Sequence, residues 1–199
     1  MTIYDLKPRF QALLRPISNS LARAGVTANQ VTVGAAVLSF ATAGLLLAYG
    51  ENPRWYLLVP VMLFIRMALN AIDGMLAREH NQKSRLGAIL NELGDIFSDS
   101  ALYFPFALIP GTNPVWVIAV VWLAAVSETA GILGQTIGAA RRYDGPLGKS
   151  DRAFLFSIVS ILLGCGITAG QWLDGVWILA IVLLAVTTLN RARRALAEK

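Results

Sequence analysis

Residues 70–95 have the sequence NAIDGMLAREHNQKSRLGAILNELGD, a polar segment between two strongly apolar stretches. It overlaps the end of the first stretch, which runs from about Trp55 to Ala77, and the start of the second, which runs from about Leu86 to Ile109. Ionisable side chains inside apolar helices are energetically costly and mark functional sites by default. We therefore take this segment as the candidate functional site of a helical membrane protein.

The composition of the chain supports a membrane protein. Of its 199 residues 56% are hydrophobic and only 15% are charged, which excludes an ordinary soluble domain. A bilayer-spanning helix needs roughly 20 predominantly apolar residues. We predict an all-α integral membrane protein with six transmembrane helices, at about residues 27–49, 55–77, 86–109, 114–140, 153–169 and 172–189.

An amphipathic segment precedes these spans. In residues 1–25, apolar side chains recur at helical spacing and basic side chains occupy the other faces, a pattern typical of a helix lying in the membrane interface. We expect this helix to be broken or bent near Pro8 and Pro16. The predicted organisation is a juxtamembrane segment, 1–25, followed by one transmembrane domain, 26–199.

The basic residues indicate the orientation of the chain. In a six-span arrangement they gather on one side, within residues 7–23, 78–85, 141–152 and 191–199, and the opposite loops contribute only Arg54. By the positive-inside rule both termini and the candidate site face the cytoplasm. The net charge of +5 then indicates contact with anionic membrane lipids, and no nucleic acid partner is expected.

The polar residues of the decisive segment fall on two helical stripes. On the first helix Asn70, Asp73 and Ala77 lie at i, i+3 and i+7, and on the second helix Gly87 is followed at steps of four by Asn91, Asp95 and Asp99. If the stripes face each other, they gather carboxylate and amide oxygens. Such a set suits Mg²⁺ or Mn²⁺ bridging to a phosphate.

This segment resembles the signature of the CDP-alcohol phosphatidyltransferase family, D-x-x-D-G-x-x-A-R-x8-G-x-x-x-D-x-x-x-D. It matches every spacing and differs only in having Asn70 and Asn91 at the first and third aspartate positions. The chain looks most like uncharacterised bacterial inner-membrane members of the family. The resemblance implies a multi-pass enzyme, often a homodimer, that transfers the phosphatidyl group of CDP-diacylglycerol to a polar alcohol and releases CMP.

The resemblance also implies residue roles. Asn70, Asp73, Asn91 and Asp95 would hold Mg²⁺ or Mn²⁺, and Asp95 would also act as the general base. Upstream, Asn29 and Thr32 resemble the family's P-N-x-x-T entry to the first span. The implied nucleotide-binding residues are Asn29, Thr32, Gly74, Ala77, Arg78, Ser84 and Gly87.

The two asparagines leave the signature positions with two formal negative charges where the family has four. An amide oxygen still ligates a hard cation, but its neutrality weakens the attraction for a second one. We expect weaker metal binding, a single strongly held metal, or compensation by Glu92 or Asp99, which adds Asp99 to the candidate ligands.

A second polar cluster spans residues 141–152, and its end resembles the basic segment that contacts the acceptor phosphate in relatives using inositol phosphate. We assign Lys149 and Arg152 to an acceptor pocket that prefers a phosphorylated or otherwise anionic alcohol. The alternative is positive-inside anchoring. Arg66 and Glu128 lie within predicted spans outside the signature. We interpret them as structural residues that could pair with each other, and a contribution to the substrate cavity is the alternative.

Two other functions remain open at this stage. Polar stripes also line ion paths, so a small transporter or channel is one alternative; Gly74, Ala77 and Arg78 at signature spacing favour the enzyme because ion conduction does not require them. A catalytically silent relative acting as a membrane binding partner is the other. The sequence does not identify the acceptor alcohol.

Overall fold

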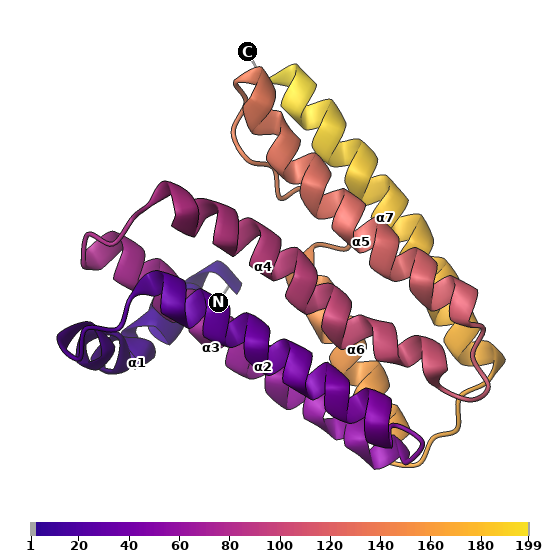
Figure 1. Cartoon of the computed structure of the whole chain (residues 1–199). Coiled ribbons are helices and arrows are strands. Elements are labelled where there is room, and N and C mark those ends of the chain that lie inside the picture. The colour runs from indigo at the N-terminus through magenta and orange to yellow at the C-terminus, as the bar shows by residue number, and fades with distance from the viewer. Residues whose placement is uncertain (1–2, 199) are drawn as a thin grey trace. The chain divides into compact units, whose positions relative to one another are not determined.

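The protein is helical in the part that the computed structural model describes, which is residues 3–198 for the backbone and 8–198 for the side chains (Figure 1). Lys7 and the other side chains before Pro8 lie outside that description, and no strand occurs within it. The α-helices are α1 Ile3–Arg23, α2 Ala28–Tyr49, α3 Leu58–Glu79, α4 Arg85–Tyr103, α5 Pro114–Leu133, α6 Lys149–Gly164 and α7 Gln171–Ala197. Three short 3-10 helices, labelled η, lie between them: η1 Pro53–Leu57, η2 Phe104–Leu108 and η3 Gly134–Ile137.

Each predicted apolar stretch forms a helix, so the all-α class is confirmed. Among the described residues, 4 helices are long and apolar enough to cross a membrane: Ala28–Tyr49, Pro53–Glu79, Pro114–Ile137 and Gln171–Ala197. Helix α4 carries Glu92, Asp95 and Asp99, and α6 has only 16 residues, about 24 Å at 1.5 Å per residue. The six-span count therefore stays a prediction.

Helix α1 corrects one expectation, because it continues through both Pro8 and Pro16. Proline in a helix interior removes a backbone hydrogen bond and usually kinks or breaks the helix. Here packing opposes that effect: Leu14 is buried, and Phe10 and Leu21 pack in the same cluster. Tertiary contacts with neighbouring helices keep the segment helical.

The chain divides into two compact units. The first comprises Met1–Ala41 and Val61–Ser98, and the second comprises Thr42–Pro60 and Asp99–Lys199. In the first unit, a core of small and branched side chains joins α1, α2 and α3. Its buried members are Leu14, Ala28, Val31, Ile72 and Leu76.

Polar contacts also tie α1 to the end of α3. The Arg15 guanidinium donates to Glu79 at 2.9 Å, and Asn19 Oδ1 lies 3.1 Å from His80 Nε2. The hydrogen bond to Glu79 raises the pKa of Arg15. Because both partners are exposed, we attribute the attachment of α1 mainly to the apolar core.

The second unit has an aromatic centre. The rings of Tyr103 and Phe156 stack at 3.7 Å, Phe106 meets Phe156 edge-on at 5.0 Å, and Trp177 lies 5.1 Å from Phe156. At its margin the Tyr56 hydroxyl donates to the Pro105 carbonyl at 2.9 Å. Because large aromatic rings dominate packing energetics, this cluster fixes how α6 and α7 meet the start of η2.

The loop before α6 is fastened to α7. Asp144 accepts from Arg142 at 2.9 Å and from Arg194 at 2.6 Å, and the Leu147 amide donates to Thr187 Oγ1 at 3.1 Å. Partial burial alone would raise the pKa of the Asp144 carboxyl, but the hydrogen bond from Arg142 and the nearby Arg194 hold that pKa below its usual value. The loop therefore enters α6 from a fixed position.

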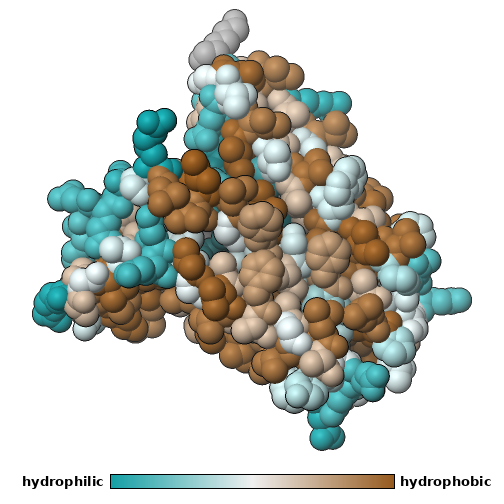
Figure 2. All heavy atoms as spheres, viewed as in Figure 1, coloured by the Kyte–Doolittle hydropathy of each residue, from teal (hydrophilic) through white to brown (hydrophobic). Residues whose placement is uncertain are grey.

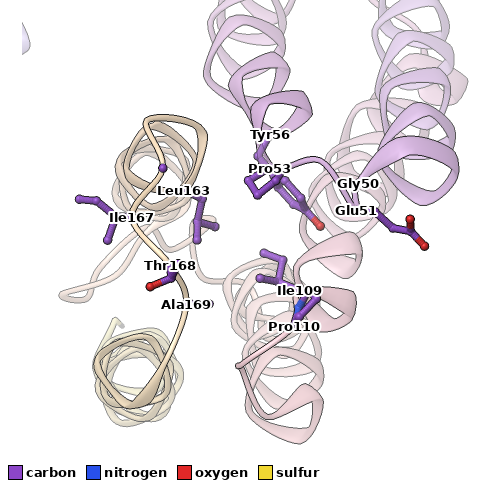
Figure 3. Close-up of a pocket in the computed structure, with 11 residues that line it drawn as sticks. Gly50, Glu51, Pro53, Tyr56, Ile109, Pro110, Leu163, Ile167, Thr168 and Ala169 are labelled. Atoms are coloured by element: carbon purple, nitrogen blue, oxygen red, sulfur yellow. The ribbon is translucent and has the colours of Figure 1, made fainter.

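The second unit also contains a cavity of about 220 Å³ (Figure 3). Its lining is mainly apolar and includes Pro53, Tyr56, Ile109, Leu163 and Ile167. The Glu51 side chain, at its rim, points away from the cavity in Figure 3. No residue predicted to bind metal, nucleotide or acceptor lines this cavity.

Large apolar side chains are exposed along the helices, and hydrophobic residues cover much of the face seen in Figure 2. Phe64 is 59% exposed, Trp122 64% and Leu179 58%. Apolar exposure on this scale is unfavourable in water, and it is expected of helices that meet lipid. The surface thus supports an integral membrane protein.

Gly145 is the position where the loop before α6 tolerates no side chain. Its φ is +130°, and a Cβ there would lie 2.6 Å from Thr187 Oγ1 and Cγ2. We expect Gly145→Ala to destabilise the protein by about 1–3 kcal/mol, measured as a lower thermal unfolding temperature in detergent. Gly175→Ala is the control, since nothing lies within 4 Å of its added Cβ; equal effects of both variants would contradict the docked loop.

Candidate active site

The signature residues lie on α3 and α4, within the first unit. Asn70 and Asp73 are on the last three turns of α3, and Asn91 and Asp95 follow on α4 after a connection of only five residues, 80–84. Asn81 adopts φ +56° in this turn, a left-handed conformation that asparagine tolerates better than most residues. The Ser84 hydroxyl then accepts from the Gly87 amide at 2.9 Å, capping the start of α4.

The two predicted stripes meet at Asp95. Asn70 Nδ2 donates to Asp95 Oδ1 at 3.0 Å, and an Arg66 terminal nitrogen lies 3.5 Å from the same oxygen. Both donors come from α3, one turn apart. The structure thus brings Asn70 and Asp95 together, as the facing stripes predicted.

Arg66 lies beside a signature residue, which agrees with the alternative that sequence analysis kept for it. Its guanidinium accompanies Asp95, and its side chain is only 4% exposed. Its position one turn before Asn70, on the same stripe, was the available signal. Glu128 has arginine partners of its own, described below.

Asp73 is held from α2. It is buried, and its Oδ2 accepts from the Thr32 hydroxyl at 2.7 Å. This contact connects the upstream Asn29–Thr32 motif to the signature through a direct hydrogen bond. A hydroxyl donor also fixes the orientation of the carboxylate, which otherwise rotates about its terminal bond.

Three of the predicted nucleotide-binding residues gather at the start of α4. A Cβ added to Gly87 would lie 2.7 Å from Asn29 Oδ1 and 3.0 Å from Ser84 Oγ. Gly87 therefore permits close approach of these two polar side chains. Sequence analysis missed a fourth participant, Gln82, whose side chain accepts from the Ala28 amide at 2.7 Å and caps α2.

Gly74 lies beside the guanidinium of Arg78. A Cβ at Gly74 would lie 3.0 Å from one terminal nitrogen of Arg78 and 3.1 Å from the other. The glycine leaves room for the guanidinium, one turn further along α3, to lie over the helix backbone. Ala77, also in the signature, stays half-buried, and Arg78 is exposed.

The proposed acceptor residues lie in the second unit, at the start of α6. Lys149 is its first residue, and the Asp151 carboxylate accepts from the Gly148 amide at 2.9 Å. Arg152 is buried, with 1% of its side chain exposed, and pairs with Glu128 at 2.8 Å. Asp99, the additional candidate metal ligand, lies 3.3 Å from Arg152.

The donor set of the signature fits a hard divalent cation, since it consists of carboxylate and amide oxygens. Two of the four residues, Asn70 and Asp95, are already in contact. Within the described residues, no group of three or more Asp, Glu, His or Cys side chains is arranged to hold a metal.

The family model for CDP-alcohol phosphatidyltransferases matches residues 25–189. The chain belongs to the CDP-alcohol phosphatidyltransferase family. The resemblance inferred from the signature is therefore confirmed, and with it the transferase class. The match also includes the start of α2 with Asn29 and the segment with Lys149 and Arg152.

Similar proteins support the same family. The chain is 49% identical over 196 residues to the inner membrane protein YnbA of Escherichia coli strain K12, covering 98% of this chain and 97% of that one. It is 30% identical over 103 residues to the archaetidylinositol phosphate synthase of Pyrococcus horikoshii, covering 52% of each. The full-length match and the apolar helices indicate an integral inner membrane protein.

Solved structures share the fold. Phosphatidylinositol phosphate synthase PgsA1 of Mycobacterium tuberculosis with CDP-DAG bound superposes with a TM-score of 0.76 at 19% identity, covering 92% of this chain and 93% of that one. The same enzyme in complex with manganese and citrate gives a TM-score of 0.74 at 20% identity, covering 92% and 88%. At 19–20% sequence identity, this structural similarity shows that the chain shares the fold of that phosphatidyltransferase.

The Thr32–Asp73 contact provides a test of the geometry. Thr32→Val removes the hydroxyl with little change in volume, and a hydrogen bond to a charged group contributes about 1.5–3 kcal/mol. We expect phosphatidyltransferase activity to fall roughly 10- to 100-fold, as measured by CMP release. Thr32→Ser, which keeps the donor, should retain most activity; equal losses in both variants would contradict this role of the hydroxyl.

Proposed function

We propose that this protein transfers the phosphatidyl group of CDP-diacylglycerol to the hydroxyl of a polar alcohol and releases CMP. The observation that carries the proposal is the junction of the two signature helices at Asp95, where Asn70 donates at 3.0 Å. It is supported by the hydrogen bond between Asp73 and Thr32 at 2.7 Å, which ties the upstream motif to the signature. Residues at the spacing of the family signature thus also contact partners within the site, Asn70 with Asp95 and Asp73 with Thr32.

Asp95 is the general base in this proposal. The acceptor oxygen attacks the phosphorus that bears diacylglycerol, while its proton passes to the Asp95 carboxylate. The bond from that phosphorus to the bridging oxygen breaks, and CMP leaves with both bonding electrons. Asp95 returns its proton to water after CMP departs. The contacts from Asn70 and Arg66 hold the carboxylate in one orientation for this transfer.

Asn70, Asp73, Asn91 and Asp95 would hold Mg²⁺ or Mn²⁺. When bound, the cation supplies positive charge beside the diphosphate oxygens. The nucleotide-binding side of the site comprises Asn29, Thr32, Gly74, Ala77, Arg78, Ser84 and Gly87. Of these, Arg78 brings the positive charge that opposes the charge developing on CMP.

The acceptor site would be formed at Lys149 and Arg152, at the start of α6. The membrane arrangement belongs to the same proposal: six spans, an interfacial α1, both termini and the active site on the cytoplasmic side, and a homodimer. The basic residues at 78–85, 141–152 and 191–199 support this orientation. A cytoplasmic site gives the nucleotide access from water, and the apolar helices give the acyl chains access from lipid.

Asp95→Asn tests the general base. The substitution keeps the shape of the side chain but removes its basic oxygen, and general-base catalysis contributes about 10²–10⁴-fold in rate. We expect CMP release from CDP-diacylglycerol to fall by at least about 100-fold in purified protein with a panel of alcohols. Glu51→Gln, at an exposed carboxylate, should be unaffected.

Two outcomes would contradict this proposal. Unchanged turnover in Asp95→Asn would reject Asp95 as the base. CMP release absent from the unaltered, folded protein with every alcohol and metal tested would favour the catalytically silent relative, with the two signature asparagines as the reason.

Metal dependence provides a separate prediction. Chelation with EDTA should abolish CMP release, and Mn²⁺ or Mg²⁺ should restore it along a curve for a single class of site. Asn91→Asp adds one negative charge to the donor set, so the metal concentration for half-maximal activity should fall about tenfold, equal to about 1.4 kcal/mol. Full activity in EDTA, or no shift in Asn91→Asp, would contradict the metal site.

A further inference from the structure

Arg66 places a guanidinium group beside a signature carboxylate within the first unit. The residue lies on α3, one turn before Asn70, and its side chain is only 4% exposed. Its terminal nitrogen lies 3.5 Å from Asp95 Oδ1, and Asn70 Nδ2 donates to the same oxygen at 3.0 Å. One carboxylate oxygen on α4 thus meets two nitrogen donors from α3, and one of these donors carries a positive charge.

Resting on the proposed function, we infer that Arg66 is a fixed cation of the site and keeps a second divalent metal ion out of it. The signature then takes one divalent cation, and the guanidinium supplies positive charge at Asp95 in place of another. The inference assigns the number of metal ions to a residue outside the signature as well as to the two asparagines within it.

The geometry at Asp95 Oδ1 opposes a metal ion at that oxygen. A carboxylate oxygen has two lone pairs, and here the oxygen faces both Asn70 and Arg66. Because Mg²⁺ lies about 2.1 Å from its ligand oxygens, an ion on Oδ1 would lie within about 6 Å of the arginine nitrogen. Like charges at that distance repel each other, and a site shielded from water screens them poorly.

The burial of Arg66 makes its contact with Asp95 difficult to displace. Helix α3 belongs to the stretch Pro53–Glu79, which is long and apolar enough to cross a membrane. A charged side chain within such a helix is costly unless an opposite charge accompanies it. A metal ion that took Oδ1 of Asp95 would separate this pair and leave the guanidinium buried without that carboxylate.

Asn70 and Arg66 contribute to the metal count in different ways. Asn70 lowers the negative charge of the ligand set, because an amide is neutral and a carboxylate is not. Arg66 adds positive charge beside the remaining carboxylate of Asp95. If the inference is right, restoring a carboxylate at position 70 is not sufficient to add a metal ion while Arg66 is present. A merely structural role of Arg66 would leave the number of bound ions unchanged when it is replaced.

The experiment counts Mn²⁺ bound per chain in the purified full-length protein, by equilibrium dialysis without lipid substrate or nucleotide. We expect one ion per chain in the unaltered protein and one in Asn70→Asp, where Arg66 offsets the added carboxylate. Asn70→Asp combined with Arg66→Met should bind one ion more. Its affinity at that added site should exceed by at least about tenfold any further binding to Asn70→Asp alone.

Matched variants separate charge from packing. Arg66→Lys combined with Asn70→Asp keeps a positive charge on a long flexible stem and should gain no ion, whereas Arg66→Met removes the charge. Arg85→Met replaces an exposed arginine at the start of α4 in the same unit and should bind Mn²⁺ like the unaltered protein. Thermal unfolding is a second readout: Mn²⁺ should raise the unfolding temperature most in Asn70→Asp combined with Arg66→Met.

Each outcome decides the inference, and none depends on turnover. Two ions bound by the unaltered protein, or by Asn70→Asp with Arg66 in place, would overturn it; these measurements stand even if the Arg66 variants do not fold. No gain of an ion in folded Asn70→Asp combined with Arg66→Met would also overturn it. Absence of Mn²⁺ from the unaltered protein would reject the metal site of the proposed function, while a gain of one ion in the combined variant would still support the role of Arg66.

Discussion

Charges inside apolar helices need partners, and this constraint organises both units of the protein. Removing one member of a buried pair typically costs 3–5 kcal/mol because the other charge is left uncompensated. In the first unit Asp95 is paired from α3 by Asn70 and Arg66. In the second, Glu128 on α5 is paired by Arg152 on α6 and Arg191 on α7. Each partnership joins different helices, so the same contacts that make the charges tolerable also set the register in which the helices pack.

Asparagine at position 70 changes how the signature helices are held together. An amide nitrogen donates a hydrogen bond, which an ionised carboxylate cannot do. Asn70 therefore bonds Asp95 directly, whereas an ionised aspartate in its place would repel Asp95 unless a cation lay between them. The substitution lowers the negative charge available to a metal, but it lets α3 and α4 meet without one. The amide of Asn70 thus joins α3 to α4 through a direct hydrogen bond to Asp95.

Hydropathy predicted the helices, and helical periodicity placed Asn70 and Asp95 on one stripe each. The two residues meet because these stripes face each other, which the sequence analysis had left as a condition. The parts of the structure that sequence analysis missed depend on contacts between residues that are distant in sequence. Gln82 caps Ala28 across 54 positions, and no local pattern identifies that pair. The break expected in α1 did not occur, since packing of Leu14 and its neighbours outweighs the effect of Pro16 on the helix. Arg152 lies in a basic segment, and only its three-dimensional surroundings show that its guanidinium is buried against Glu128 and Asp99.

The two asparagines determine the formal charge of the four signature positions. Four signature carboxylates would balance two divalent cations, and two carboxylates, Asp73 and Asp95, balance one. In the proposed site, this donor set would reach neutrality with a single metal, and Arg78 would remain as the cationic side chain of the signature for the nucleotide. In the second unit the carboxylates of Glu128 and Asp99 face three guanidinium groups, those of Arg141, Arg152 and Arg191. The two carboxylates therefore offset two of these three positive charges.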